Sequence, residues 1–358
     1  MRSGATFIFS LGLGIAAIGC APNMQNGGRD DAKPLNVGLE LQKKGDVEGA
    51  IAEYRTAIRL NPNDAVAHYN LGIALRQKGD IEGAISEYRT AIRLNPNNAN
   101  AHVNLGFALA AQGDLDEATT EYRTAARLNP SDPVAHYNLG IALARQGHLD
   151  EAIAEYRTAL LLDPIDTNAH HNLGNALEHQ GDHEGAIAEY RAALRLNPDD
   201  AVAHYNLGTA LEHQGDHEGA IAEYRTALRL NPDDAVVHHN LGVALAGRGD
   251  FDGAIAEYRI VLGLNPNDAV AHYNLGTAFL AKGDLDKAME EFRTALGLNP
   301  NLVIIHYHLG RFLMDQGNLL KAQKELEEFI RLAQDQPSLR HEIDDAKGRL
   351  DKLSVFEE

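Results

Sequence analysis

Residues 201–234 read AVAHYNLGTALEHQGDHEGAIAEYRTALRLNPDD, and this stretch decides the fold because the chain repeats it. Shifting the 358-residue sequence by 34 positions places it on itself without an insertion or deletion. Eight copies carry an Asn-Pro or Asp-Pro pair near their end, at Asn61-Pro62, Asn95-Pro96, Asn129-Pro130, Asp163-Pro164, Asn197-Pro198, Asn231-Pro232, Asn265-Pro266 and Asn299-Pro300. A fixed period of this length predicts an array of one supersecondary unit, each copy packing on its neighbours.

Each copy has the pattern of two helices joined by a short turn. In residues 201–234, apolar residues recur at helical spacing before Gly215-Asp216 and again after it. Glycine can close the first helix in the left-handed conformation, and aspartate can cap the second. Asn231-Pro232 then ends the second helix, because proline restricts the residue before it. The unit is therefore a helical hairpin.

Small and large residues alternate at fixed places in the repeat when Asp31 is counted as position 1. Position 8 is Gly in all nine copies, position 20 is Ala in all nine, and position 27 is Ala in seven of the first eight, with Val261 in the seventh. Leu or Val at position 7, Leu or Phe at 11 and Tyr or Phe at 24 supply most of the large side chains. Dense packing between hairpins requires such an alternation.

This 34-residue hairpin resembles the tetratricopeptide repeat through Leu71-Gly72, Ala84, Tyr88, Ala91 and Pro96. The resemblance implies an all-α fold, a right-handed α-α superhelix of about nine helical hairpins. The repeats are predicted at 31–64, 65–98, 99–132, 133–166, 167–200, 201–234, 235–268, 269–302 and 303–336. The amphipathic pattern of residues 337–354 predicts a C-terminal capping helix over the last exposed apolar face.

The first thirty residues have the pattern of an export signal followed by a polar tether. Residues 1–19 combine Arg2 with a short apolar run and read as a signal peptide. The segment ending at Cys20, the single cysteine, resembles the lipobox of bacterial lipoproteins, which implies lipidation of Cys20 and a flexible tether over residues 20–30. The alternative is an ordinary signal peptide with an incidental cysteine.

Lipidation would place the chain in the bacterial cell envelope. Ala21 stands where many inner-membrane lipoproteins have aspartate, so we expect an outer-membrane lipoprotein that faces the periplasm. The alternative location is that of a secreted or periplasmic soluble protein.

Composition and motifs exclude two broad classes of function. With 32 Lys+Arg against 51 Asp+Glu, the net charge of −19 disfavours nucleic-acid binding, which needs clustered cations. No GxSxG elbow, P-loop or dinucleotide motif is present, and no non-repetitive segment is large enough for a catalytic domain. We therefore expect neither an enzyme nor a cofactor.

Histidine recurs at position 4 of eight repeats, from His68 to His306. Equivalent positions on neighbouring hairpins lie roughly 8–10 Å apart, whereas metal ligands lie about 2 Å from the ion, so this row predicts no metal site. The pairs His179 with His183 and His213 with His217 each span a Gly-Asp turn and lose i,i+4 geometry. A metal or pH sensor stays the less favoured alternative.

Helix A of each hairpin carries the candidate binding residues, because in the tetratricopeptide family this helix lines the concave groove. Asn is a mediocre helix former, yet it recurs at position 6. These residues are Asn36, Asn70, Asn104, Asn138, Asn172, Asn206, Asn240 and Asn274. A carboxamide offers a donor and an acceptor to a peptide unit, as in the asparagine ladder of the O-linked N-acetylglucosamine transferase arm, which this row resembles. The alternative is that Asn only bridges neighbouring helices.

Five tyrosines at position 5 of helix A complete the predicted peptide-binding groove: Tyr69, Tyr137, Tyr205, Tyr273 and Tyr307. The lysine at position 2 that marks carboxylate-clamp members of the family is missing, which disfavours a receptor for chaperone tails. Positions 12 and 13 run from Lys43 and Arg76 through Glu178 and Glu212 to apolar residues, which favours a partner of mixed charge.

The sequence thus predicts a non-enzymatic protein–protein interaction scaffold that binds an extended peptide or a helix of a partner protein. A second hypothesis is a regulatory or substrate-recruiting arm for a separate enzyme subunit.

Overall fold

The computed structural model describes residues 32–354, and the side chains of residues 33–351. These residues form nineteen α-helices and one 3-10 helix, with no strand among them. They divide into two compact units, which we call the N-terminal unit (residues 32–198) and the C-terminal unit (residues 199–354). The predicted signal peptide, the predicted tether and Cys20 lie outside the described residues.

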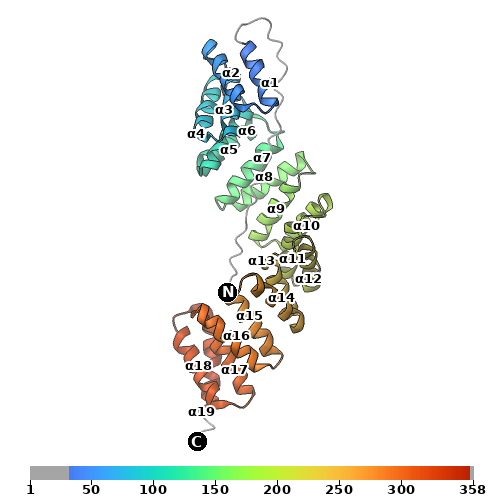
Figure 1. Ribbon diagram of the computed structural model, residues 1–358, viewed down its shortest axis with the longest axis vertical. Coiled ribbons are helices and arrows are strands. Elements are labelled where there is room, and N and C mark those ends of the chain that lie inside the picture. Colours follow the sequence, from blue (N-terminus) through green and yellow to red (C-terminus); the bar gives the residue numbers. More distant parts are fainter. Residues whose placement is uncertain (1–31, 355–358) are drawn as a thin grey trace. The chain divides into compact units, whose positions relative to one another are not determined.

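The N-terminal unit contains five helical hairpins, drawn in blue to green in Figure 1. Their first helices (helices A) are α1 (Ala32–Lys43), α3 (Ala65–Lys78), α5 (Ala99–Gln112), α7 (Pro133–Arg145) and α9 (Thr167–Gln180). Their second helices (helices B) are α2 (Val47–Leu60), α4 (Ile81–Leu94), α6 (Leu115–Leu128), α8 (Leu149–Leu162) and α10 (His183–Leu196).

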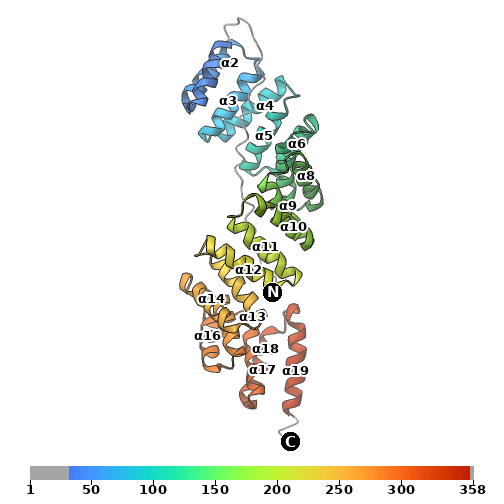
Figure 2. The same ribbon diagram turned by 90° about the vertical axis from the view of Figure 1, so that its right-hand side faces the viewer.

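The C-terminal unit contains four hairpins and the end of the chain. Its helices A are α11 (Ala201–Gln214), α13 (Ala235–Gly247), α15 (Ala269–Ala281) and α17 (Ile304–Asp315). Its helices B are α12 (His217–Leu230), α14 (Phe251–Leu264), α16 (Leu285–Leu298) and α18 (Leu319–Ala333). The 3-10 helix η1 (Pro337–Leu339) and α19 (Arg340–Ser354) follow, and Figure 2 shows α19 beside α17 and α18.

The turn has the predicted chemistry in seven of the nine hairpins; before α8 and α18 the cap positions are His148 and Asn318, whose side chains make no cap hydrogen bond. Gly79 closes α3 with φ of +89°, a left-handed conformation that glycine adopts without steric cost. Asp80 then caps α4, because its Oδ1 accepts a hydrogen bond of 2.9 Å from the amide of Gly83. At the far end of α4, the amide of Asn95 donates to the Ala91 carbonyl before Pro96 ends the helix.

The two helices of a hairpin pack through the small residue at position 8 and the ring at position 24. A Cβ atom on Gly72 would lie 2.6 Å from Cε1 of Tyr88, so only glycine leaves room for that ring. Tyr88 is completely buried, as are Ala84 and Ala91 on the same helix. The alternation of small and large residues in the sequence therefore corresponds to close packing inside each hairpin.

The last hairpin is covered by α19. Leu339 and Ala346 are buried in a cluster with Tyr307, Phe329 and other residues of α17 and α18, and Ile343 and Leu350 pack against it. The predicted all-α fold of helical hairpins with a C-terminal capping helix is thus confirmed. The right-handed turn of the superhelix stays a prediction.

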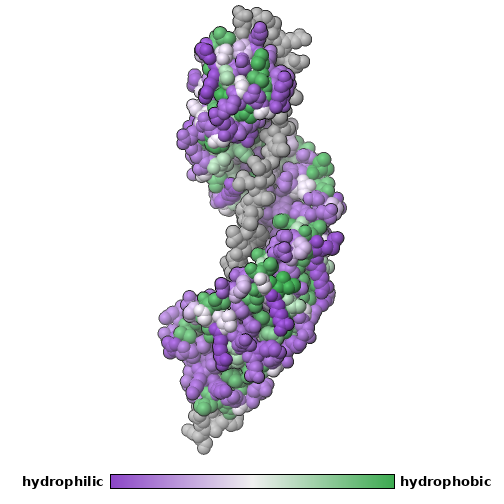
Figure 3. All heavy atoms as spheres, viewed as in Figure 1, coloured by the Kyte–Doolittle hydropathy of each residue, from purple (hydrophilic) through white to green (hydrophobic). Residues whose placement is uncertain are grey.

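The surface is mainly hydrophilic on the face drawn in Figure 3, with hydrophobic residues in smaller areas between. Among the described residues, no helix combines the length and the hydropathy needed to cross a membrane. Of the large apolar side chains in residues 33–351, Leu161 and Ile165 are the most exposed, at 81% and 72%.

Candidate peptide-binding face

Helices A of consecutive hairpins contact each other directly, although a helix B lies between them in the sequence. This holds for α1 with α3, α3 with α5, α5 with α7 and α7 with α9 in the N-terminal unit, and for α13 with α15 in the C-terminal unit. From the resemblance to the family we expect the side chains at positions 2, 5, 6, 9, 12 and 13 of helices A to face the groove, and we call this set the helix-A face. In each unit it lies on helices that are spatial neighbours.

The predicted asparagines differ in exposure along the helix-A face. Asn36 is exposed, while Asn138, Asn240 and Asn274 are partly buried. The other four are buried: Asn70, Asn104, Asn172 and Asn206. Their burial requires hydrogen bonds, since an unpaired buried amide costs about 1–3 kcal/mol.

Several of these asparagines use their amide nitrogen to bridge two repeats. Nδ2 of Asn104 donates to the Tyr69 hydroxyl at 3.1 Å, and Nδ2 of Asn172 donates to the Tyr137 hydroxyl at 3.0 Å. In the C-terminal unit, Nδ2 of Asn240 lies 3.1 Å from the Tyr205 hydroxyl. Each bond joins position 6 of one repeat to position 5 of the repeat before it.

The remaining bonds of the row are variations on this bridge. Asn274 contacts Nε2 of His239 at 3.3 Å, and the Tyr273 hydroxyl contacts Nε2 of His308 at 3.0 Å. Asn70 and Asn138 donate only to carbonyls of their own helices, at Val66 and Val134. The Tyr307 hydroxyl donates to Asp345 of α19 at 2.9 Å, so the capping helix occupies its polar atom.

The bridging bonds leave specific polar atoms available. Within the described residues, the Oδ1 atoms of Asn104, Asn172 and Asn240 accept no hydrogen bond. A tyrosine hydroxyl that accepts the asparagine amide keeps its own hydrogen as a donor. A bridged Tyr–Asn pair therefore offers one acceptor and one donor, whereas the sequence predicted both on the asparagine alone.

Four of the five tyrosines at position 5 recur every second repeat, a period that was not predicted from the sequence. Tyr69, Tyr137, Tyr205 and Tyr273 lie 68 residues apart, and Val103, His171 and His239 occupy the intervening repeats. Each of the four tyrosines is accompanied at position 2 by an exposed valine, Val66, Val134, Val202 or Val270. The signal was present in the sequence, as a comparison of odd with even repeats, but the stronger 34-residue period concealed it.

The histidines at position 4 lie away from this row and join three parts of each repeat. His68 places Nδ1 2.5 Å from Oε2 of Glu87 on helix B, and Nε2 3.1 Å from the carbonyl of Pro62 in the preceding loop. All eight histidines make the carboxylate contact, with Glu87, Glu121, Glu155, Glu189, Glu223, Glu257, Glu291 and Glu325.

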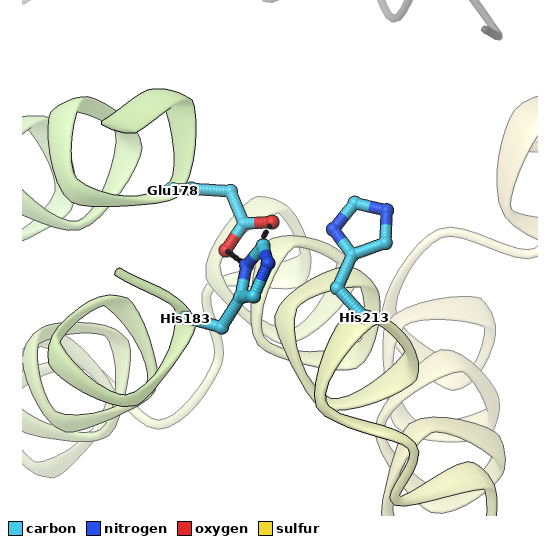
Figure 4. Close-up of side chains that lie close together, drawn as sticks. All are labelled: Glu178, His183 and His213. Atoms are coloured by element: carbon cyan, nitrogen blue, oxygen red, sulfur yellow. Dashed lines mark hydrogen bonds and ion pairs between the residues drawn. The ribbon is translucent and has the colours of Figure 1, made fainter. Parts of the chain in front are cut away.

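The histidines after two of the turns pair with glutamates before them. Nδ1 of His183 lies 3.0 Å from both oxygens of Glu178, as Figure 4 shows, and the Glu178 side chain is nearly buried. In the C-terminal unit, Nδ1 of His217 lies 3.0 Å from Glu212. In each of these two turns, the histidine that follows the Gly-Asp pair contacts a glutamate of the preceding helix.

Comparisons with known proteins give the family. The profile described as "Cilia and flagella-associated protein 70 C-terminal domain" matches residues 21–241, more than half of the chain. Two profiles described as "Tetratricopeptide repeat" match residues 239–303 and 279–341. No curated protein matches the chain.

Solved structures show the same fold. The C-terminal part of a TPR repeat-containing protein from Cytophaga hutchinsonii matches with a TM-score of 0.58 and 16% identity, covering 67% of this chain and 99% of that one. PilF of Pseudomonas aeruginosa matches with a TM-score of 0.50 and 21% identity, covering 56% and 92%. YrrB, described as a TPR protein with an unusual peptide-binding site, has 27% identity and a TM-score of 0.48, covering 51% and 95%.

The profiles span residues 21–341, and the hairpins within the described part have the 34-residue spacing of their repeat. The chain therefore belongs to the tetratricopeptide-repeat family.

Proposed function

We propose that this protein is a non-enzymatic interaction scaffold that binds an extended peptide or a helix of a partner protein along the helix-A face. Proteins of this repeat family act generally as non-catalytic scaffolds, and protein or peptide partners follow from the fold. The identity of the binding surface rests on the polar atoms of helices A.

The observation that carries the proposal is the bridged Tyr–Asn pair. In Tyr69–Asn104 and Tyr137–Asn172, the hydrogen bond from the asparagine amide to the tyrosine hydroxyl fixes both side chains. The Oδ1 atom of the asparagine and the hydroxyl hydrogen of the tyrosine can then meet the N–H and C=O of one peptide unit. Because the pair is held by its own hydrogen bond, it loses little conformational freedom when a partner binds.

The spacing of the pairs suits an extended chain. Pairs recur every second repeat, which is roughly 20 Å when hairpins lie about 10 Å apart. An extended peptide rises about 3.3 Å per residue, so successive pairs meet backbone groups about six residues apart. The exposed valines beside the tyrosines, such as Val66 and Val134, add apolar contact at the same interval.

We further propose that the scaffold works in the bacterial cell envelope, anchored through a lipid on Cys20. The support is the sequence alone: the short apolar run, the lipobox-like ending and the polar tether. The proposed location is the outer membrane, with the repeats facing the periplasm.

The binding proposal is tested by replacing asparagines of the helix-A face. A partner would be recovered by affinity capture from the source organism. Its affinity would be measured for the wild type and for a triple variant in which Asn172, Asn206 and Asn240 are all replaced by Ala. The matched control is a second triple variant that replaces Asn63, Asn97 and Asn267 with Ala, since those side chains are exposed in the loops between repeats. We expect the first variant to lose affinity at least ten-fold while circular dichroism still shows a folded helical protein. Equal affinity of both variants would contradict the proposal.

A further inference from the structure

The valines at position 2 are spaced differently in the two units. In the N-terminal unit, valine alternates with asparagine along four successive repeats, in the order Val66, Asn100, Val134 and Asn168. In the C-terminal unit, three successive repeats each carry an exposed valine: Val202 at 57%, Val236 at 58% and Val270 at 46%. Apolar side chains at this position are therefore two repeats apart in the N-terminal unit and one repeat apart in the C-terminal unit.

The three valines of the C-terminal unit belong to one continuous face. Nδ2 of Asn240 on α13 donates to the Tyr205 hydroxyl on α11 at 3.1 Å. Nδ2 of Asn274 on α15 lies 3.3 Å from Nε2 of His239 on α13. Position 2 is one helical turn before positions 5 and 6 on the same side of each helix, so the valines lie beside these contacts. Val243, at position 9 of α13, is also exposed, and we call these four valines the valine surface.

The centre of the valine surface carries no charge. Helices α13 and α15 contain no Asp, Glu, Lys or Arg, although the chain has 32 Lys and Arg and 51 Asp and Glu. Burial lowers the pKa of His239, which keeps this ring uncharged at neutral pH. Charged groove positions of the unit lie on the helices to either side, such as Glu212 on α11 and Arg311 on α17. A charged group placed over α13 and α15 would lose water without gaining a partner of opposite charge, so the complementary ligand surface is apolar and uncharged.

The spacing of the valines determines which backbone conformation of a ligand fits. Neighbouring hairpins lie roughly 10 Å apart, which corresponds to about three residues of an extended chain. Residues three apart in a β-strand point to opposite faces, so a strand cannot place a side chain on every valine. Two repeats correspond to about six residues, which point the same way and suit the alternate valines of the N-terminal unit. In an α-helix, residues seven apart share one face and lie about 10.5 Å apart, which fits one valine per repeat.

The hydrogen bonds between helices A also favour a helical ligand in the C-terminal unit. Polar contacts join successive repeats there at three steps: Tyr205 with Asn240, His239 with Asn274, and Tyr273 with His308. These contacts use polar atoms that would otherwise meet the backbone of an extended chain. An extended or polyproline II segment needs partners for its N–H and C=O groups when it loses water, whereas a helix pairs most of them internally. A helix therefore covers the valine surface with fewer unpaired groups.

The width of the valine surface matches a helix as well. Positions 2 and 9 are seven residues apart on helix A, a distance of about 10.5 Å, and an α-helix with its side chains is about 10–12 Å across. A helix that lies across α11, α13 and α15 thus contacts the valines of position 2 along one side and Val243 along the other.

We infer that the valine surface of the C-terminal unit binds an amphipathic α-helix of a partner protein, whose uncharged apolar face has an aliphatic side chain at every seventh residue. The inference rests on the proposed function and adds the conformation and the chemistry of the partner at this unit. The main driving force is burial of aliphatic surface on both sides, since the facing groups carry no charge.

The test uses the full chain and blocked synthetic peptides labelled for fluorescence anisotropy. The first is a helix of alanine and glutamine, stapled on its far side, with three leucines seven residues apart. The second has the same composition with leucines five residues apart, which spreads them around the helix. The third is rich in proline and has leucine at every third residue, on one side of a polyproline II helix. We expect the first peptide to bind about ten-fold more tightly than either of the others, because only it combines the spacing with a paired backbone.

Val236→Thr locates the binding site. The substitution keeps the shape of the side chain and puts a hydroxyl under the bound helix, so affinity for the first peptide should fall about ten-fold. Val66→Thr makes the same change at position 2 of the N-terminal unit and should leave this affinity unchanged. Both valines are exposed, at 58% and 42%, so thermal unfolding should be the same for the two variants and the wild type.

Three results would overturn the inference: equal affinity for the two helical peptides, tighter binding of the proline-rich peptide, or equal losses in Val236→Thr and Val66→Thr. Each of them leaves the proposed function standing if the captured partner is still weakened by the asparagine replacements. Equal affinity of that partner for the two asparagine variants contradicts the proposed function, whichever peptide binds.

Discussion

Asn172 donates its side-chain amide to the hydroxyl of Tyr137, one repeat earlier, at 3.0 Å and out of contact with most solvent. The sequence left open whether such asparagines bind a partner or bridge neighbouring helices, and in this pair the nitrogen does bridge them. Binding and folding therefore share these residues, and any test of one must measure the other.

Tyr137→Phe should destabilise the protein. The substitution removes the acceptor of a buried amide, and leaving Asn172 unpaired costs about 1–3 kcal/mol. Urea unfolding followed by circular dichroism measures the change. In a double-mutant cycle with Asn172→Ala we expect a coupling of about 1 kcal/mol. Asn138→Ala is the control, because its amide bonds only within its own helix and should show no coupling to Tyr137.

Gly72→Ala should destabilise the second hairpin. The new Cβ would lie 2.6 Å from the fully buried Tyr88 ring, and overpacking of this kind costs about 1–3 kcal/mol. The same change at Gly263, a helical glycine of α14 with no atom within 4 Å of the new Cβ, should stabilise by up to about 1 kcal/mol. Thermal unfolding of the two variants should shift in opposite directions; a matching shift would show that the Tyr88 contact is not tight.

The His102–Glu121 pair should make stability depend on pH. The hydrogen bond that Nδ1 of His102 donates to Glu121, at 2.5 Å, raises the pKa of His102 above its ordinary 6.5, and the Pro96 carbonyl at 3.1 Å also favours the protonated ring. A folded pKa above the unfolded one stabilises fully below pH 6.5, and this contribution is lost as the pH rises through the folded value.

Glu121→Gln isolates this effect. The wild type should exceed the variant in stability by about 1–3 kcal/mol at pH 5.5, and by less at pH 8.5. Burial lowers the pKa values of His239 and His308, but both are present in the two proteins and cancel in the difference. A stability difference that grows between these pH values would contradict the assignment.

Cys20→Ser should abolish lipid attachment if residue 20 is the lipidated cysteine of an envelope lipoprotein. Metabolic labelling with an alkyne fatty acid in a bacterial host should mark the wild type and not the variant, which should move from the membrane to the soluble fraction. Labelling of both proteins, or continued membrane association of the variant, would refute the lipid anchor. Ala21→Ser, which keeps the cysteine, is the control.

The sequence by itself determined the elements and their order. The recurrence of pairs such as Gly79-Asp80 and Asn95-Pro96 places a turn and a helix end in most copies, because these residues act through local backbone conformation. Gly72 and Tyr88 are sixteen residues apart, and a glycine and a large residue recur at this spacing in every repeat, which predicts close packing within a hairpin. Such local and periodic signals need no knowledge of the rest of the fold.

Only the tertiary structure decided what each polar atom of the helix-A face does. Asn104 and Asn138 have the same repeat position, yet one bridges to Tyr69 and the other bonds within its own helix, because the preceding repeat offers Val103 in place of a tyrosine. The unpaired Nε of Arg76 could not be predicted either, since it depends on Phe107 and Tyr88 from two other helices. Hydrogen bonding is directional and short in range, so identical residues in successive repeats acquire different roles from the neighbours that packing brings to them.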